Sequence, residues 1–283
     1  MKKRIITISL VIALLATCFA GTYAYLTDKD AAVNTMTLGS VDIEQYEYER
    51  ELNADGTYKT DTIDGRTSYV LTAFTQNKPL YPIVGDPNEP GNSPVYAGYD
   101  DTVVRMSQVE SQGSMQVFAG KNAQDKFIVV KNTGKSDAYV RTLVAFECGS
   151  KTEAEWANLV KTSVFMSSDG VWTTFSAGVK TIDGSNYVVW EYIYNGGAHL
   201  GGVHENGILP AGETTYPGLC QIYLKHYATN EDMTALDGNN NGKMDILVLS
   251  QAVQAAGFDD ARTALDAAFG TVEAKAADWF ENI

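Results

Sequence analysis

The stretch Lys126–Glu147, KFIVVKNTGKSDAYVRTLVAFE, contains two strand-like runs on either side of a turn signal. Its first part, Lys126–Asn132, and its last part, Ala138–Glu147, are β-branched and aromatic runs of the kind that form strands. Between them, Asn132-Thr133-Gly134 is a turn signal, because Asn and Gly readily adopt the φ angles that tight turns require. We therefore predict two paired strands joined by a turn.

Similar runs recur along the chain and are separated by glycine turns such as Ser168-Asp169-Gly170 and Asp183-Gly184. The other expected strands are Thr35–Gln45, Ser163–Ser167, Val171–Phe175, Asn186–Tyr194, Tyr216–Tyr227 and Met244–Ala255. Met244–Ala255 is ambiguous between helix and strand, and we predict strand for its first half. Helices are expected only at Thr152–Lys161, which begins with a capping-box pattern, and at Asp259–Phe269. Eight strands without alternating helices predict an all-β, antiparallel β-sandwich with a few short helices.

Tyr46–Ser114 differs from the rest, because it holds five of the seven prolines and two Asp-Gly turns. We interpret it as a long insertion after the first strand, carrying a hairpin or two, rather than as a second domain. The sandwich is then expected over 35–270, with the insertion at 46–114, and 271–283 is expected to be a C-terminal tail.

The N-terminus has the pattern of an export signal. Basic residues at Met1–Arg4 precede the apolar run Ile5–Ala20, and small residues follow at Thr22 and Ala24. We predict a signal peptide over 1–24, cleaved between Ala24 and Tyr25. An uncleaved anchor and lipidation at Cys18 are the alternatives, which the short run and the residues around Cys18 disfavour.

The composition excludes several classes of protein. The chain has 283 residues, 45% of them hydrophobic, so a packed core is affordable and disorder is not expected. Acidic residues outnumber basic ones by 14, and by 17 once Lys2, Lys3 and Arg4 leave with the signal. Such a surface repels nucleic acid and anionic membrane, so neither is an expected partner of the mature protein.

Three ordered stretches resemble the TasA/camelysin family of exported Gram-positive proteins. The first is Gly21–Asp28 followed by NTMTLGSVDI at Asn34–Ile43. The second runs from Phe118–Lys121 through Lys126–Gly134 to Ala138–Arg141, where the family has paired strands joined by an N-x-G turn. The third and weakest is LPAGETT, Leu209–Thr215, with the strand to Tyr227 and Ile246–Gly257. The insertion departs from the family.

The resemblance implies a jelly-roll-like sandwich, a signal peptidase of the SipW type as processing partner, and polymerisation into extracellular fibres of the biofilm matrix. In such fibres the N-terminal segment of one subunit completes the sheet of the next. Here the donor strand would be Tyr25–Ala31, within the segment 25–34, and it includes Tyr25, Leu26, Thr27 and Asp28. Tyr25 and Leu26 would be its apolar anchors. An extended peptide binds an exposed sheet edge through its backbone groups. A frayed terminus is the alternative.

Two cysteines, Cys148 and Cys220, remain after signal cleavage. Alternation places Cys148 on a strand face with Val140, Val144 and Phe146, and Cys220 on a face with two other apolar side chains. A disulfide between them in the oxidising exterior, and two buried free thiols, both fit this pattern.

Camelysin has been classed as a metallopeptidase, so the resemblance also raises an enzyme hypothesis. The three histidines are His199, His204 and His226, and they do not form H-E-x-x-H or another common zinc spacing. We interpret them as solvated loop histidines. The chain also lacks the G-x-S-x-G motif and a phosphate-binding glycine loop. We therefore predict that it is not an enzyme.

One loop has the spacing of calcium ligands. DGNNNGKMD, Asp237–Asp245, fits the first nine positions of a calcium loop, with Asp237, Asn239, Asn241 and Asp245 as side-chain ligands and the Lys243 backbone carbonyl as a fifth. The twelfth position is Val248, so Asp232 or a neighbouring loop would have to supply the missing carboxylate. A plain Asn/Gly turn fits the same residues.

Together these patterns predict a secreted, non-enzymatic structural protein of the extracellular matrix or cell surface. Its expected partners are copies of itself and other matrix or surface proteins, and calcium is the only cofactor suggested. The alternatives are a monomeric adhesion or binding module that uses the insertion, and a camelysin-like surface metallopeptidase.

Overall fold

The structure is a computed structural model that describes residues 27–31, 41–63, 66–83, 95–96, 116–117, 122–164, 170–196 and 204–281. Its first strands are β1 (Thr27–Ala31), β2 (Ile43–Arg50), β3 (Thr60–Ile63), β4 (Arg66–Tyr69), β5 (Leu71–Ala73), β6 (Val95–Tyr96), β7 (Gln116–Val117) and β8 (Gln124–Asp125). The later strands are β9 (Phe127–Asn132), β10 (Ala138–Glu147), β11 (Val160–Val164), β12 (Trp172–Ile182), β13 (Ser185–Tyr194), β14 (Ile208–Leu209), β15 (Leu219–Leu224) and β16 (Ile246–Gln254). The helices are α2 (Glu153–Leu159), α3 (Asn230–Leu236), α4 (Ala261–Phe269), α5 (Val272–Phe280) and the 3-10 turn η4 (Glu205–Gly207).

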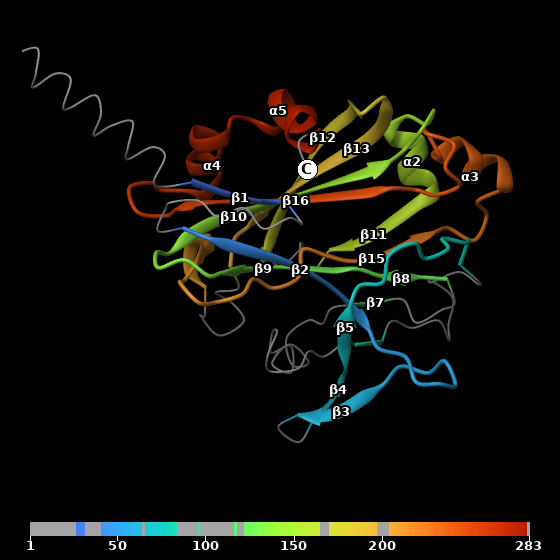
Figure 1. Cartoon of the computed structure of the whole chain (residues 1–283), viewed down its shortest axis with the longest axis horizontal. Helices are drawn as coiled ribbons and strands as arrows, with labels where there is room; N and C mark the ends of the chain where they lie inside the picture. The colour runs from blue at the N-terminus through green and yellow to red at the C-terminus, as the bar shows by residue number, and fades with distance from the viewer. Residues whose placement is uncertain are drawn as a thin grey trace, which may run out of the picture.

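Twelve of these strands form two layers, which confirms the predicted all-β, antiparallel sandwich-like class (Figure 1). One layer is a sheet in the order β1-β16-β10-β13-β12, with β14 paired to the start of β10. The other layer holds two smaller sheets, β5-β2-β9 and β11-β15-β8. The Thr215 N–H donates to the Val130 carbonyl at 2.8 Å and the Gly218 N–H to the Ile128 carbonyl at 2.9 Å, so the chain entering β15 joins the two smaller sheets at β9.

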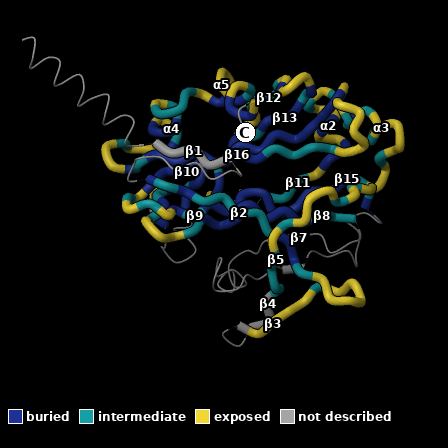
Figure 2. Tube along the Cα trace, viewed as in Figure 1, coloured by how far each residue is buried: buried dark blue, intermediate teal, exposed yellow. Residues whose placement is uncertain are grey.

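The core lies between the layers and also behind the larger sheet. All ten residues of β10 are buried, because both faces of this strand are covered (Figure 2). Val140, Val144 and Phe146 face the core between the layers, as the alternation predicted. On the opposite face, Leu143 packs beneath α5 and Tyr139 beneath α4.

A buried arginine on β10 fastens the helices to this outer face. Arg141 Nη1 donates to Glu191 Oε1 on β13 at 3.0 Å and to Asp266 Oδ1 on α4 at 2.8 Å. Its Nη2 donates to the carbonyl of Gly270, between α4 and α5, at 3.0 Å, and its Nε donates to Gln251 Oε1 on β16 at 2.8 Å. One guanidinium group thus links both neighbouring strands to the helical cover.

The connection between β9 and β10 differs from the prediction. The two strands do not pair, because β9 lies in one layer and β10 in the other. Asn132 supports this crossing: its amide nitrogen donates to the Ser136 carbonyl at 2.8 Å and to the Leu209 carbonyl at 3.0 Å. Its side-chain oxygen accepts the Gly134 N–H at 3.0 Å. The chain does turn at the predicted residues. Asn and Gly occur both in hairpins and in turns that cross between layers, so this motif did not distinguish the two.

The Asp183-Gly184 turn is a tight hairpin, as predicted. Ile182 pairs with Ser185, and both turn residues have positive φ, 47° at Asp183 and 84° at Gly184. Two positive φ angles suit the right-handed twist of the flanking strands β12 and β13.

Several element boundaries differ from the expected ones. The strand expected at Thr35–Gln45 begins at Ile43 and continues to Arg50, because pairing with β9 and β5 extends it; residues 35–40 lie outside the described part. The helix expected at Thr152–Lys161 has the predicted capping box at Thr152 but ends at Leu159, where β11 begins by pairing with β15. Residues 165–167 of the expected strand Ser163–Ser167 also lie outside the described residues.

Two helices were not predicted. The expected tail 271–283 contains α5, whose Val272, Ala276, Trp279 and Phe280 are buried against the larger sheet, so it belongs to the core. The expected strand Tyr216–Tyr227 forms β15 only over Leu219–Leu224, and α3 follows it. Met244–Ala255 is a strand over nearly its whole length.

The insertion contains a hairpin, β3–β4, which projects away from the larger sheet in Figure 1. At its base the Arg50 Nε donates to Asp125 Oδ2 at 2.6 Å and the Nη2 donates to Oδ1 at 2.8 Å. The guanidinium also lies 3.7 Å from the centroid of the Tyr58 ring. This buried ion pair attaches the start of the insertion to β8.

Candidate functional site

The predicted donor segment forms an edge strand in the structure. β1 pairs antiparallel with β16, from Thr27 opposite Val253 to Ala31 opposite Leu249. It is the last strand of the larger sheet in the described part of the chain. Thr27 and Asp28 therefore lie in a strand of their own subunit. Ala24, Tyr25 and Leu26 lie outside the described residues, so the cleavage site and the two anchors stay predictions.

The edge of β16 continues beyond the end of β1. Ile246, Leu247 and Val248 pair with β10 on one side, but within the described residues β1 covers only Leu249–Val253 on the other. These three residues line a cavity of about 900 Å³ at this end of the sandwich.

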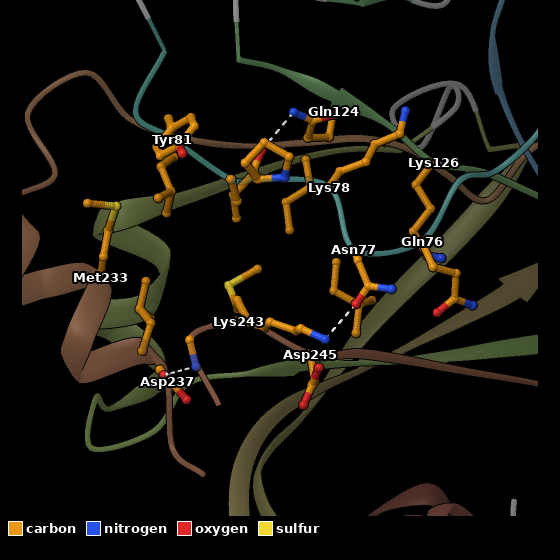
Figure 3. A pocket seen from close by; sticks show the side chains of 18 of the residues that line it. Gln76, Asn77, Lys78, Tyr81, Gln124, Lys126, Met233, Asp237, Lys243 and Asp245 are labelled. Atoms are coloured by element: carbon orange, nitrogen blue, oxygen red, sulfur yellow. Dashed lines mark hydrogen bonds between the residues drawn. The ribbon is translucent and has the colours of Figure 1, made fainter. Parts of the chain in front are cut away.

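The cavity lies between the insertion, α3, β15 and the loop 237–245 (Figure 3). Its apolar lining includes Leu224, Leu236, Met233 and Met244. Its insertion wall is held in place by two amide side chains that donate to backbone carbonyls: Gln124 to Pro79 at 3.0 Å and Asn122 to Pro82 at 2.8 Å.

Three lysines line the cavity, and each has a partner. Lys78 pairs with Glu49, and Lys126 with Glu47. Lys243 donates to Asn77 Oδ1 at 2.6 Å and thereby connects the loop 237–245 to the insertion (Figure 3). Sequence patterns did not predict this cavity, because its walls come from an insertion and a helix without a recognisable motif.

The structure brings the predicted calcium-ligand residues together in one loop. Asp237 accepts the N–H groups of Asn241 at 3.0 Å and Gly242 at 2.7 Å. Asp245 Oδ2 accepts the side-chain amides of Asn239 and Asn241, both at 3.0 Å. The acidic oxygens are thus satisfied within the loop, and a cation would have to displace the two amide donors from Asp245.

Glu147, at the end of β10, holds the backbone of this loop in place, and no sequence pattern predicted that role. Its Oε1 accepts the Gly238 N–H at 2.9 Å and the Asn239 N–H at 3.2 Å, and its Oε2 accepts the Asp245 N–H at 2.9 Å. Burial raises the pKa of Glu147, and the hydrogen bonds oppose that shift. Only the β10–β16 register, which puts Phe146 opposite Ile246, could have identified it.

Asp232 does not supply the missing calcium ligand in this structure. It caps α3 through Thr229 and pairs with Lys151 at 2.9 Å. The hydrogen bond from Lys151 lowers the pKa of Asp232 to about 2. The carboxylate of Glu147 does face the loop backbone, but it already accepts three N–H groups. Calcium binding stays a prediction that rests on Asp237, Asn239, Asn241, Lys243 and Asp245.

Cys148 and Cys220 are free thiols in the structure, and both are buried. Cys148 and Cys220 belong to the apolar core between the layers, on the strand faces that the alternation predicted. Burial raises the pKa of Cys148 to about 11, which keeps this thiol protonated and unreactive at neutral pH. Of the two arrangements that the sequence left open, the structure has the free thiols.

The histidines do not converge on a site in the described residues. His204 is buried, contrary to the expectation of a solvated loop histidine, and its Nδ1 lies 2.5 Å from the Tyr194 hydroxyl. Its Nε2 is buried without a hydrogen-bond partner. His226 is exposed beside Tyr227, and His199 lies outside the described residues.

The burial of His204 predicts an acid-sensitive stability. Burial lowers its pKa from the usual value near 6.5, and the nearby Glu213 only partly opposes this shift. The unfolded chain therefore binds a proton at a higher pH than the folded chain. The free energy of unfolding should fall as pH drops below about 6.5, by at most about 1.4 kcal/mol per pH unit.

Denaturant unfolding of the His204→Gln variant across this pH range measures the effect. The variant should lose the His204 part of the slope, whereas His226→Gln should keep it. Glu147 and Glu191, whose pKa values burial raises, are common to all three proteins and cancel in the comparison. Equal slopes for wild type and His204→Gln would contradict the assignment.

Within the described part of the chain, no group of three or more His, Cys, Asp or Glu side chains is placed to hold a metal ion. No helix of that part has the length and apolar character needed to cross a membrane. No family model, curated protein or solved structure matches the chain.

Proposed function

We propose that this protein is an exported structural subunit that assembles head to tail into extracellular fibres by exchanging β1 between neighbouring subunits. The observation that carries the proposal is the place of β1. It is a short strand at the sheet edge, it precedes the other described strands in the chain, and it pairs only with β16 among them.

Exchange of β1 between subunits needs no hydrogen bonds other than those that β1 already makes to β16. The β1 of a second copy can make the same backbone hydrogen bonds to Leu249–Val253 that the subunit's own β1 makes, in the same register. An exchange between identical elements is a low-cost route to association, and a head-to-tail contact that does not close yields a filament. The acidic surface disfavours other contacts between copies.

The resemblance to the TasA/camelysin family supports the same proposal, because it implies strand donation by Tyr25–Ala31 after signal cleavage. While the signal is attached, this segment is tied to the membrane. Cleavage after Ala24 by a SipW-type peptidase would release it for exchange.

Cysteine pairs test the exchange directly. We expect chains carrying Thr27→Cys to form disulfides with chains carrying Val253→Cys, because these positions face each other in the β1–β16 register. Directly opposed Cβ atoms lie about 4.5–5.5 Å apart, close to disulfide distance. The measurement is the amount of covalent heterodimer in mixtures of the two variants, each with one added cysteine besides the buried Cys148 and Cys220, compared with the dimer that each variant forms alone.

The matched control pairs Thr27→Cys with Leu249→Cys, four residues out of register and therefore about 13 Å away along the strand. Electron microscopy of the mature protein and of a variant lacking residues 25–30 then relates exchange to fibres. Equal fibre formation by both proteins, or disulfides only within chains that carry both cysteines, would contradict the proposal.

The cavity favours a second candidate, a surface binding module that uses the insertion. Its volume of about 900 Å³ and its lining of apolar side chains with several polar and charged ones suit a ligand site. A protein that stays monomeric with β1 intact and binds surface components through residues 74–81 would support this candidate instead.

A further inference from the structure

The tip of the loop 237–245 holds an Asn-Gly pair in a set of hydrogen bonds. Asn241 and Gly242 are both exposed. The Asn241 Oδ1 accepts the N–H of Lys243, two residues on, at 2.8 Å. This turn folds the side-chain amide back over the peptide that joins Asn241 to Gly242.

An asparagine in this position can react with its own backbone. The backbone nitrogen of the next residue attacks the side-chain Cγ, and glycine hinders the attack least because it has no Cβ. Such an intramolecular step is favoured when the reacting groups are held together. It is accelerated further by a base at the attacking N–H and by a donor at the oxygen that becomes negatively charged.

The structure places a base, a donor for the developing oxyanion and an acceptor for the leaving nitrogen around Asn241. The Gly242 N–H donates to Asp237 Oδ2 at 2.7 Å, within reach for proton transfer to that carboxylate. The Lys243 N–H, at 2.8 Å, stabilises charge on Oδ1. The leaving nitrogen, Nδ2, donates to Asp245 Oδ2 at 3.0 Å, which orients it within the loop.

We propose that this loop is a self-modification site in which Asn241 deamidates through a cyclic imide, with Asp237 as the base. Gly242 N bonds to Asn241 Cγ while its proton passes to Asp237. The Cγ–Nδ2 bond then breaks, and Nδ2 takes up that proton and leaves as ammonia. Water opens the imide to aspartate or isoaspartate, so the balance is one amide and one water to one acid and one ammonia.

The modification changes the loop. A carboxylate replaces an amide that donates to Asp245, so an attractive hydrogen bond becomes a repulsion between like charges. The loop gains one negative charge beside the cavity that Asp237 and Asp245 line. The charge of this rim would therefore depend on the age of the protein.

The same chain provides matched controls. Asn239 has a similar arrangement, with its Oδ1 accepting the Asn241 N–H and its Nδ2 donating to Asp245, but Asn240 follows it instead of glycine. Asn195 and Asn206 are followed by glycine but lie outside this loop.

The test follows deamidation by peptide mass mapping during incubation of the full chain at neutral pH, both folded and in urea. We expect folding to accelerate conversion at Asn241 by about tenfold or more, a modest part of what general base catalysis can supply. Asn195, Asn206 and Asn239 should not be accelerated. A folded rate equal to or below the rate in urea would overturn the proposal, because the loop would then protect Asn241.

The Asp237→Asn variant tests the role of the base. Its conversion in the folded state should fall toward the rate in urea, while the rate in urea itself stays unchanged. If folded Asp237→Asn converts as fast as the wild type, Asp237 is not the base. The comparison of folded and denatured wild type stays decisive even where this variant disturbs the loop.

Discussion

The Arg141→Met variant should lose about 3–5 kcal/mol of its free energy of unfolding, the usual cost of removing one partner from a buried ion pair. The side chain of Arg141 is fully buried, and that of Glu191 is 1% exposed. Methionine fills much of the space of the aliphatic stem but provides no donor. Glu191 would then keep a buried charge with only the more distant Arg262, at 3.4 Å.

The loss would extend to the helical cover. Arg141 also donates to Asp266 and to the Gly270 carbonyl, and its guanidinium lies 5.0 Å from the Trp279 ring centroid. Without these bonds, α4 and α5 are held to the sheet mainly by apolar contacts. Amide exchange in residues 261–280 should therefore increase more than exchange in β9 or β15.

Chemical denaturation and hydrogen exchange measure the two effects. Arg262→Met is the control, because Arg262 also contacts Glu191 but its side chain is 37% exposed, so its loss should cost less than about 1 kcal/mol. Adding Glu191→Gln to Arg141→Met should recover part of the stability by removing the stranded charge. A cost for Arg141→Met no larger than that for Arg262→Met would show that the guanidinium does not hold the cover.

Each of the eight strands predicted from the sequence overlaps one of the sixteen strands that the structure describes, because alternation and Asp-Gly turns are local signals. Ala138–Glu147 was predicted with its correct limits, since its two covered faces give a nearly continuous apolar run. Because both faces of this strand are buried, its pattern does not indicate which face packs against the second layer and which packs against the helices. Arg141 therefore has no sequence signal that sets it apart from other strand residues, although it bonds to β13, β16 and the helical cover.

What sequence reasoning missed depends on contacts between distant segments. The tail predicted at 271–283 contains α5, because its apolar residues pack against the larger sheet, a contact that no local pattern in this segment indicates. The predicted hairpin between β9 and β10 is absent. Its sequence contains no local signal for the hydrogen bond from Asn132 to the Leu209 carbonyl, 77 residues away. Glu147 lies beside the loop 237–245 because β10 pairs with β16, a strand about 100 residues further along the chain. No local pattern indicates this pairing.

The buried ion pair between Arg50 and Asp125 attaches the insertion to the sandwich. We expect Asp125→Ala to lower the free energy of unfolding by about 3–5 kcal/mol, because it leaves the Arg50 guanidinium buried without its carboxylate. Arg50 Nη1 already lacks a hydrogen-bond partner, so the group has no spare acceptor in the structure. Asp125 also accepts from Gln221 Nε2 on β15 at 3.0 Å, and the change breaks that link as well.

This variant also separates the insertion from the sandwich, since Asp125 joins the end of β2 to β8 and β15. Limited proteolysis should cut residues 51–83 of Asp125→Ala well before the strands of the larger sheet. Lys59→Ala is the matched control in the same region: its ion pair with Glu51 is exposed and should contribute less than about 1 kcal/mol. If Asp125→Ala is no less stable than Lys59→Ala, the insertion is held by the stacking of Tyr58 and Tyr69 on Arg50 instead of by the ion pair.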